Sequence, residues 1–468
     1  MNISEGCILD NNKYFEKFLD NHCFNQGDKE EGYWINESSF EFIIRPECNQ
    51  KCEYCYIARY GKDLYPLETR ANNEKILKNM NIMLDYIFNE RKVLFLEIEL
   101  FAGDLFYDNL GFSIFDLLLK YYGALFEEHP NLFKNHHPRI AFPNNFSFVA
   151  DDKKAAKMEE YLQKFLDLEL ELNLSCSVDG HYDSVREENK DFEYYDKIMQ
   201  FLSRNCCGIH PMISPNNIES AIKNYDWWLE QFEKYKLCKG PRDEFQPMFL
   251  EVRNDEWTEE KLNHYLEFLT HMLEIRFQMN DSSLDKLARH IFLGDGEEGS
   301  LIGLHNYDPL QPTVTWKDGN YTCAISHQTC FYVATMELVP CHRTSYQQFI
   351  GGRFEVENDK IIGVTAVNPS LYTVIKTNNT HLNVGCVTCP YDPFCLKLCL
   401  GAALEATGDL FLPPKSVCEL HKTRISFLVK SYCELGLTKI ALEKNYFPDE
   451  KYKENWLNLC HNLGYYND

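Results

Sequence analysis

The sequence lacks long apolar runs. No stretch of the 468 residues reaches the roughly 18 uninterrupted apolar residues of a membrane-spanning helix. The stretch 112–126 comes closest, but Asp116 and Lys120 interrupt it, so we expect a packed amphipathic helix there. The N-terminal residues 1–5 also lack the basic and then apolar pattern of a secretory signal. We therefore expect a cytoplasmic protein with no membrane partner.

Positive charge is scarce as well. The chain carries 47 Lys and Arg residues against 71 Asp and Glu residues, which gives a net charge of −24 at pH 7. Such a surface repels phosphate backbones, so we expect no nucleic-acid partner. Hydrophobic residues make up 44% and aromatic residues 14% of the chain, as in a globular protein. The length predicts two or three domains.

Cysteine, in contrast, is abundant, with 19 residues. In a reducing compartment, clustered cysteines are more often metal ligands than disulfide partners. Most of these cysteines fall in two regions at ligand-like spacing, and the others are scattered.

The first region is the loop that contains Cys48, Cys52 and Cys55, in a Cys-x3-Cys-x2-Cys pattern. This spacing lets one short loop direct three thiolates at a single metal cluster. A four-iron cluster held by three cysteines keeps one iron open to a small molecule, which indicates redox chemistry on a cofactor. The alternative is a structural zinc site, but zinc prefers four ligands, often from two cysteine pairs.

Strands and helices are expected to alternate along the first 290 residues. Apolar stripes at helical spacing separate short apolar or alternating runs. This order predicts a parallel sheet with right-handed crossovers, and six units are too few to close an eight-fold barrel. Residues 1–36 are polar and expected to be irregular. The expected strands are 39–45, 93–101, 139–142, 168–178, 209–213 and 248–253.

The position of the cysteine loop agrees with this α/β architecture. The loop follows the first expected strand directly, and ligands of parallel α/β folds lie at the C-terminal ends of the strands. The second cysteine region spans 386–399 with the pattern Cys-x2-Cys-x5-Cys-x3-Cys. A zinc ribbon is the alternative for this second region.

The loop around Cys48 resembles the signature of the radical S-adenosylmethionine (SAM) superfamily, and 386–399 resembles the core of its C-terminal SPASM extension. The resemblance covers about residues 37–425. The motifs are similar to those of the peptide-maturing members of this superfamily, which include sactipeptide and cyclophane synthases and anaerobic sulfatase-maturing enzymes. It implies a partial (β/α)6 TIM-like barrel, followed by a cysteine-rich domain of small hairpins and helices. It also implies three [4Fe-4S] clusters and bound SAM.

The resemblance further implies SAM-binding positions. Tyr54 matches the aromatic residue before the third cysteine, and Ala102-Gly103-Asp104 stands where the family has Gly-Gly-Glu. The proline that follows in the family is replaced here by leucine. Read without the family, this segment is a glycine turn after a strand.

Polar residues at other strand ends extend this comparison. Ser177 and Arg186 match a Ser-x-Asp-Gly segment and its following arginine, although an N-cap and a surface ion pair explain them equally well. Asn144 and Asn145 stand where relatives have a Thr-Asn-Gly turn. Arg253 ends the sixth expected strand and faces either the cavity or a structural ion pair.

The SPASM resemblance implies two auxiliary clusters. Their ligands are Cys323, Cys330, Cys341 and Cys399 for the first, and Cys386, Cys389, Cys395 and Cys418 for the second. Met336 replaces a glycine of the family, which suggests a different hairpin turn. If Cys330 is not a ligand, the first auxiliary cluster has an open iron. His342 stands where sulfatase-maturing relatives place an aspartate base, so it is a candidate base, with a merely supporting or surface histidine as the alternative.

These inferences give one hypothesis of domains and function. The domains are an extension (1–36), a radical SAM partial barrel (37–290), a linker (291–320), the SPASM domain (321–425) and a helical tail (426–468). The enzyme would abstract hydrogen from a ribosomally made peptide or a protein side chain and form an oxidative thioether, C–C or ether cross-link. A flavodoxin or ferredoxin would supply electrons. The alternatives are a small-molecule substrate, or a non-catalytic iron–sulfur or zinc protein that binds a partner.

Overall fold

The computed structural model divides the chain into two compact units. The first comprises 1–177, 193–208 and 324–378, and the second comprises 178–192, 209–323 and 379–468. Each unit is therefore assembled from separated stretches of sequence. The structure describes the residues 11–186, 194–205, 207–237, 249–253, 255–279, 283–293, 309–312, 325, 328–377, 384–395 and 399–465.

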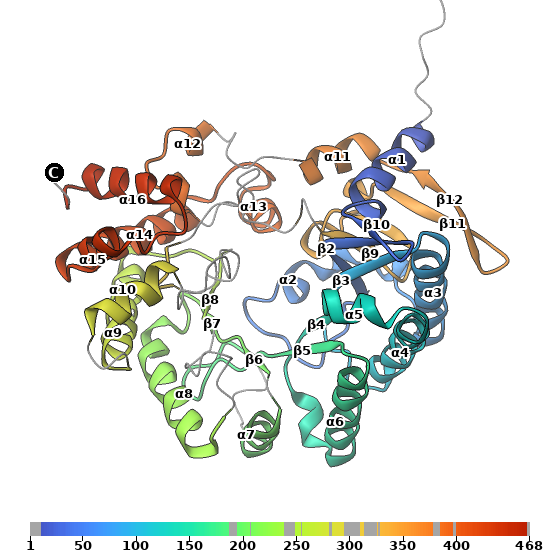
Figure 1. Ribbon diagram of the computed structural model, residues 1–468, viewed down its shortest axis with the longest axis horizontal. Coiled ribbons are helices and arrows are strands. Elements are labelled where there is room, and N and C mark those ends of the chain that lie inside the picture. The colour runs from blue at the N-terminus through green and yellow to red at the C-terminus, as the bar shows by residue number, and fades with distance from the viewer. Residues whose placement is uncertain are drawn as a thin grey trace, which may run out of the picture. The chain divides into compact units, whose positions relative to one another are not determined.

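A mixed sheet of parallel and antiparallel strands forms the centre of the first unit (Figure 1). Its strand order is β12-β11-β10-β9-β2-β3-β4-β5-β6, and β1 pairs with β2 at the side. β2, β3, β4 and β5 pair in parallel with one another, as expected, while β1 is antiparallel to β2 and β9 to β12 form antiparallel hairpins. The strands are β1 (Lys29–Glu30), β2 (Tyr33–Arg45), β3 (Val93–Ala102), β4 (Arg139–Asn144), β5 (Glu171–Cys176), β6 (Gly208–Ile209), β9 (Thr329–Tyr332), β10 (Glu337–Val339), β11 (Gly352–Glu357) and β12 (Lys360–Ala366).

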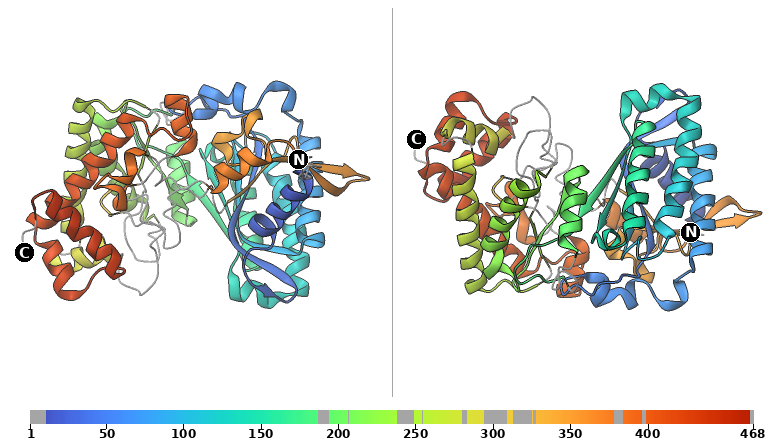
Figure 2. Two further views of the ribbon diagram at one scale, coloured as in Figure 1. Left: turned by 90° about the horizontal axis from the view of Figure 1, so that it is seen from above. Right: turned by 90° about the horizontal axis from the view of Figure 1, so that it is seen from below.

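Helices cover one face of this sheet. α3, α4 and α6 lie side by side there (Figures 1 and 2), and Asp151 caps the start of α6 by accepting from the Lys153 amide. The helices of the unit are α1 (Asn11–Leu19), α2 (Tyr56–Leu64), α3 (Asn73–Asp85), α4 (Leu110–Glu128), α5 (Pro130–His136), α6 (Asp152–Asp167), α7 (Tyr195–Arg204) and α11 (Pro369–Thr377). Shorter or π-helical turns are η1 (Asp20–Phe24), η2 (Leu67–Thr69), η3 (Tyr86–Glu90), η4 (Ser147–Ala150), η9 (His342–Thr344) and η10 (Gln347–Phe349).

Side chains on β2 alternate between two environments. Phe40 and Phe42 are buried and stack with Phe331 of β9, at centroid distances of 6.0 and 5.4 Å. On the same face, Phe142 of β4 packs against Phe115 of α4. The residue between the two phenylalanines, Glu41, points to the opposite face because successive strand residues alternate. The face of the sheet opposite the helices therefore carries a buried carboxylate.

Two features of the first unit differ from the sequence expectation. The N-terminal residues were expected to be irregular, but 11–24 form α1 and η1, and Phe15 and Phe18 pack edge-on against Tyr372 of α11. In addition, β9 pairs in parallel with β2, so a strand from the cysteine-rich region extends the central sheet. No periodicity within one segment reveals a pairing between segments this far apart.

The second unit is mainly helical. The expected fifth strand, 209–213, is split: Ile209 ends β6 of the central sheet, and β7 (Met212–Ile213) pairs in parallel with β8 (Leu250–Glu251), from the expected sixth strand, in a separate sheet. α14 contacts α9, α15 and α16. The helices are η6 (Ile218–Ser220), α8 (Ala221–Tyr235), α9 (Glu259–Met279), α10 (Leu284–Leu293), α12 (Val384–Val387), η12 (Asp392–Phe394), α13 (Leu400–Thr407), α14 (Lys415–Glu434), α15 (Leu437–Lys444) and α16 (Glu450–Asn462).

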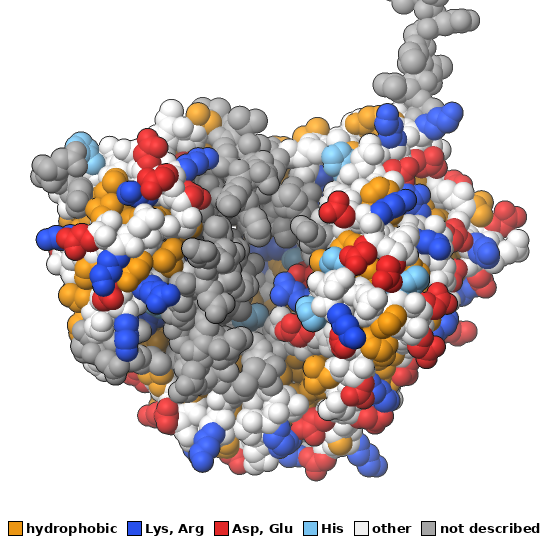
Figure 3. Space-filling model, in the orientation of Figure 1, with side chains coloured by type: hydrophobic (Ala, Val, Ile, Leu, Met, Phe, Trp, Pro, Cys, Tyr) orange, Lys and Arg blue, Asp and Glu red, His pale blue; other side chains and the backbone are white. Residues whose placement is uncertain are grey.

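The surface carries charges of both signs. Acidic and basic side chains are interspersed over the face drawn in Figure 3.

Within the described residues, no helix combines the length and the apolar character needed to cross a membrane.

The pairing of β9 with β2 predicts the effect of one substitution. Phe331→Ala removes a fully buried ring between the two strands and should lower the free energy of unfolding by about 3–5 kcal/mol. Urea denaturation followed by circular dichroism measures the change. Ile362→Ala on β12, where the side chain is 60% exposed, is the matched control and should change stability by less than about 0.5 kcal/mol. Equal effects of the two substitutions would contradict this packing.

Candidate functional site

The cysteine loop connects β2 to α2. Cys48 is exposed, Cys52 is buried and Cys55 is half-buried. The loop is folded by local hydrogen bonds: the Cys55 amide donates to the Cys52 carbonyl at 3.0 Å, and the Gln50 amide donates to the Cys48 sulfur at 3.3 Å. Tyr54 is half-buried in the turn before Cys55. The three thiols therefore belong to one short, internally bonded loop at the C-terminal end of β2.

The end of β3 holds this loop through backbone contacts. The Gly103 amide donates to the Arg45 carbonyl at 3.0 Å, and the Asp104 amide donates to the Glu47 carbonyl at 2.9 Å. A Cβ atom on Gly103 would lie 2.2 Å from the Glu47 oxygen. Glycine is therefore required at 103 by the close approach of two chain segments. Ala102 precedes it as the last residue of β3.

The carboxylate of Asp104 accepts hydrogen bonds from its own loop and from the segment at the end of β4. It accepts from the Phe106 amide at 2.8 Å and from the Ser147 hydroxyl at 3.0 Å, and its side chain is buried. Arg45 donates to the Asp104 carbonyl at 3.0 Å and forms an ion pair with Asp108 at 2.8 Å. Burial alone would raise the pKa of Asp108, but Arg45 lowers it to about 2. These bonds fix the segment that follows β3.

The end of β4 also meets the cysteine loop. The Asn145 side chain donates to the side chain of Asn49, between Cys48 and Cys52, at 2.8 Å. Asn144 donates to Asp104 at 3.4 Å, and its carbonyl accepts from the amide of Ser177 at 2.9 Å. The structure thus brings the sequence-predicted residues at the ends of β2, β3, β4 and β5 together.

The thiols of the loop influence one another electrostatically. Desolvation, and then the charges of Asp104, Cys52 and Cys55, raise the pKa of the Cys48 thiol to about 12. Bound iron would reverse this by stabilising thiolates. Among the described residues, no three His, Cys, Asp or Glu side chains are arranged to share one metal ion. The fit of a cluster is therefore judged on donor chemistry, and three thiols on one loop match an iron–sulfur cluster.

A histidine–carboxylate pair lies on the face of the sheet opposite α3, α4 and α6. His342 Nδ1 lies 2.8 Å from Glu41 of β2, whose side chain is fully buried. The His342 ring stacks on Phe101 of β3 at 4.2 Å and lies 5.6 Å from the ring of Tyr56, the first residue of α2. Burial opposes protonation, but Glu41 raises the pKa of His342 above its usual value. Two rings and one carboxylate therefore fix the orientation of His342.

Glu99 is the neighbour of Glu41 on β3. Desolvation, and then the Glu41 carboxylate, raise the pKa of Glu99 to about 7, and Gln328 donates to it at 3.1 Å. Sequence reasoning missed both carboxylates. The available signal was a glutamate placed between two large apolar residues of a strand, in Phe-Glu-Phe and Ile-Glu-Leu.

Four of the predicted auxiliary ligands belong to the second unit, and three of them act electrostatically on the fourth, Cys418. Burial, and then the charges of Cys395, Cys386 and Cys389, raise the pKa of Cys418 to about 11. Cys418 lies in the first turn of α14, and the Cys389 amide donates to the Cys386 carbonyl. These four thiols form the donor set that the sequence analysis assigns to the second auxiliary cluster.

The other auxiliary set is only partly described. Cys330 and Cys341 are both buried in the first unit, and burial, Glu41 and Cys341 raise the pKa of Cys330. Cys399 precedes α13 in the second unit, and Cys323 lies outside the described residues. Met336 adopts φ +58°, the left-handed conformation that glycine favours. The β9–β10 turn therefore keeps a glycine-like backbone despite the side chain.

The remaining sequence candidates belong to the second unit. Arg186 is buried and donates from Nε to Asp179 at 2.8 Å, and Asp179 also accepts from the Met212 amide. Arg186 therefore forms an ion pair, but the pair is buried and not at the surface as one of the two expectations had it. Arg253 follows β8 and is partly buried.

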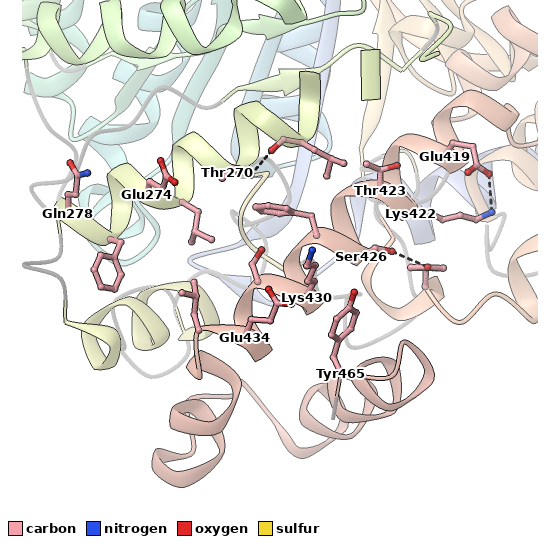
Figure 4. Close-up of a pocket in the computed structure, with 17 residues that line it drawn as sticks. Thr270, Glu274, Gln278, Glu419, Lys422, Thr423, Ser426, Lys430, Glu434 and Tyr465 are labelled. Atoms are coloured by element: carbon pink, nitrogen blue, oxygen red, sulfur yellow. Dashed lines mark hydrogen bonds and ion pairs between the residues drawn. The ribbon is translucent and has the colours of Figure 1, made fainter. Parts of the chain in front are cut away.

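A separate groove of about 1060 Å³ lies between α9 and α14 (Figure 4). Apolar side chains such as Leu273 and Phe427 line it together with Lys422 and Lys430, and none of its described lining residues is a cysteine. Tyr391 and Glu419, which also line it, are neighbours in sequence of the assigned ligands Cys389, Cys395 and Cys418, so the groove borders that cysteine region.

Comparisons with known proteins support the fold alone. No family model and no curated protein matches the sequence. A solved structure of hexahistidine-tagged anSMEcpe with bound AdoMet (SAM) is similar at 14% identity and a TM-score of 0.50, covering 90% of this chain and 98% of that one. Native anSMEcpe with bound AdoMet gives 15% identity, a TM-score of 0.49 and coverages of 87% and 99%. At this low identity the likeness shows the fold, and this chain shares its fold with an AdoMet-bound protein over most of both chains.

The contact at Gly103 predicts a specific defect. Gly103→Ala should push the Cys48 loop away from β3 and lower the free energy of unfolding by about 1–3 kcal/mol. Urea denaturation measures the loss. Gly123→Ala within α4 is the control, because the nearest atom would lie at an ordinary 3.9 Å. A Gly103→Ala protein as stable as the control variant would show that the two segments do not touch in this way.

Proposed function

We propose that this protein is a radical SAM enzyme that modifies a ribosomally made peptide or a protein side chain. The observation that carries the proposal is the loop of Cys48, Cys52 and Cys55, held by the end of β3 on the fold of an AdoMet-bound enzyme. The finer reading of the fold is a partial (β/α)6 barrel with a SPASM extension. The expected reaction is hydrogen abstraction followed by oxidative cross-link formation.

Three [4Fe-4S] clusters and SAM are the proposed cofactors. When bound, they would supply a 5′-deoxyadenosyl radical and an acceptor for a further electron. Flavodoxin or ferredoxin is the proposed electron donor, in the cytoplasm. The first cluster is assigned to Cys48, Cys52 and Cys55, and SAM to Tyr54, Ala102, Gly103, Asp104, Ser177 and Arg186. The auxiliary clusters are assigned to Cys323, Cys330, Cys341 and Cys399, and to Cys386, Cys389, Cys395 and Cys418.

The structure changes the role we assign to Asp104. Its carboxylate oxygens already accept from Phe106 and Ser147. We therefore assign its side chain to holding the loop, and leave the backbone of 102–104 to meet SAM. In this role Asp104 is a positioning residue.

His342 is the proposed base. Its Nδ1 atom faces Glu41, so Nε2 is the ring nitrogen that can take a proton from a substrate. Glu41 is then a positioning residue, which fixes the tautomer and stabilises the protonated ring. The stacking of His342 on Phe101 limits ring rotation.

The similarity to a sulfatase-maturing enzyme over 98% of that chain favours a peptide or protein substrate over a small molecule. A non-catalytic iron–sulfur protein is the remaining alternative, and SAM cleavage distinguishes it from the enzyme.

SAM cleavage is the direct test of the proposal. After anaerobic reconstitution, the protein should contain about 12 iron atoms and should release 5′-deoxyadenosine and methionine when dithionite and SAM are added. Replacing Cys48, Cys52 and Cys55 together by alanine should reduce iron to about eight atoms and abolish cleavage. Cys207→Ala, outside the assigned sets, should retain both properties. A wild-type protein that contains its full complement of iron but leaves SAM intact would refute the proposal that the protein is a radical SAM enzyme.

If His342 is the base, its replacement should affect formation of the modified peptide but not SAM cleavage. His342→Gln should retain SAM cleavage but lower formation of the modified peptide by about 10²–10⁴-fold, because only deprotonation is removed. Glu41→Gln should produce a smaller loss. Mass spectrometry of a co-expressed candidate peptide measures product, and His264→Gln on the exposed face of α9 is the control. Equal product from wild type and His342→Gln would exclude His342 as the base.

A further inference from the structure

Two cysteines outside all the assigned ligand sets meet in the second unit. Cys433 near the end of α14 and Cys460 of α16 lie with their sulfur atoms 3.6 Å apart, within a hydrogen bond. Thr438 of α15 contacts the Cys433 sulfur at 3.5 Å, and its hydroxyl also accepts from the Trp456 indole at 3.3 Å. The two helices pack against each other, so this approach is part of the packed structure.

The two thiols differ in access and in acidity. Cys433 is partly exposed, whereas Cys460 is fully buried. The hydrogen bonds with Cys460 and with Thr438 lower the pKa of Cys433 to about 7, against the effect of burial. The same contact raises the pKa of Cys460. An accessible, acidic thiol next to a buried one is the arrangement of an attacking and a resolving cysteine.

We propose that Cys433 and Cys460 form a modification site that reacts with low-molecular-weight disulfides and closes reversibly into an intramolecular disulfide. The Cys433 thiolate attacks one sulfur of the small disulfide, which forms a mixed disulfide and releases one thiolate. The Cys460 sulfur, after losing its proton, then attacks Cys433 and releases the second thiolate. The two cysteines lose two electrons, the small disulfide gains them, and the two protons pass to the released thiolates.

The geometry allows this closure with little movement. A disulfide bond is about 2.05 Å long, so the sulfur atoms must approach by about 1.5 Å, a distance that side-chain rotation covers. The bond would close a loop over the 27 residues from Cys433 to Cys460, which contains α15. Ser431 and Glu434, on either side of Cys433, line the groove in Figure 4. The disulfide would therefore fix the end of α14 that forms one wall of this groove.

Treatment of the reconstituted full-length protein with oxidised glutathione under anaerobic conditions tests this proposal. Non-reducing tryptic digestion and mass spectrometry should detect a peptide pair that links Cys433 to Cys460, and dithiothreitol should separate it. The link should form at least about tenfold faster than glutathione adds to buried Cys23. Cys460→Ser should retain a stable glutathione adduct on Cys433, because the resolving thiol is missing. Cys433→Ser should leave Cys460 unmodified.

Cys23→Ser, in the first unit, is the control variant and should form the same link as wild type. A wild-type protein that accumulates a stable glutathione adduct on Cys433, or that forms no link, would overturn the proposal. This wild-type result decides the matter even if a serine variant does not fold. The test does not depend on SAM cleavage, so its failure would leave the proposed function untouched.

Discussion

The backbone contact between the end of β3 and the start of the cysteine loop is the constraint on which the candidate site depends. Two amides, of Gly103 and Asp104, donate to two carbonyls, of Arg45 and Glu47, and the absence of a side chain at 103 allows this approach. Asp104 then uses its carboxylate to fold the next turn, and Arg45 connects that turn back to the end of β2. The position of Cys48 relative to the sheet therefore follows from contacts that involve no cofactor.

The two faces of the central sheet carry different kinds of side chain. The helix-covered face holds aromatic side chains such as Phe40, Phe42 and Phe331, which supply stability. The opposite face holds Glu41, Glu99 and His342. Burial and the Glu41 charge raise the pKa of Glu99, and Glu41 raises the pKa of His342 against the effect of burial. Buried titratable groups cost stability, so their concentration on one face next to the cysteine loop indicates a functional role.

The sequence predicted the strands and helices that follow from local periodicity. It also predicted that the cysteine loop lies at the C-terminal end of a parallel strand, where ligands bind in this class of fold. β2 to β5 occur where periodicity indicated, and the cysteine loop follows β2. It did not predict how Asp104 is used, because a carboxylate after a strand serves a ligand or its own loop equally well. It also missed the pairing of β9 with β2 and the contact between His342 and Glu41, which join residues about 300 positions apart. Such contacts depend on the tertiary fold rather than on any one segment.

Electron paramagnetic resonance of the dithionite-reduced protein, recorded before and after addition of SAM, tests the central claim most directly. The claim is that the Cys48 loop holds a cluster with one open iron that binds SAM. We expect SAM to change the signal of one cluster, and we expect this signal to be missing when Cys48, Cys52 and Cys55 are replaced. A spectrum that is unchanged by SAM, or a SAM-sensitive signal that persists without the three cysteines, would contradict it.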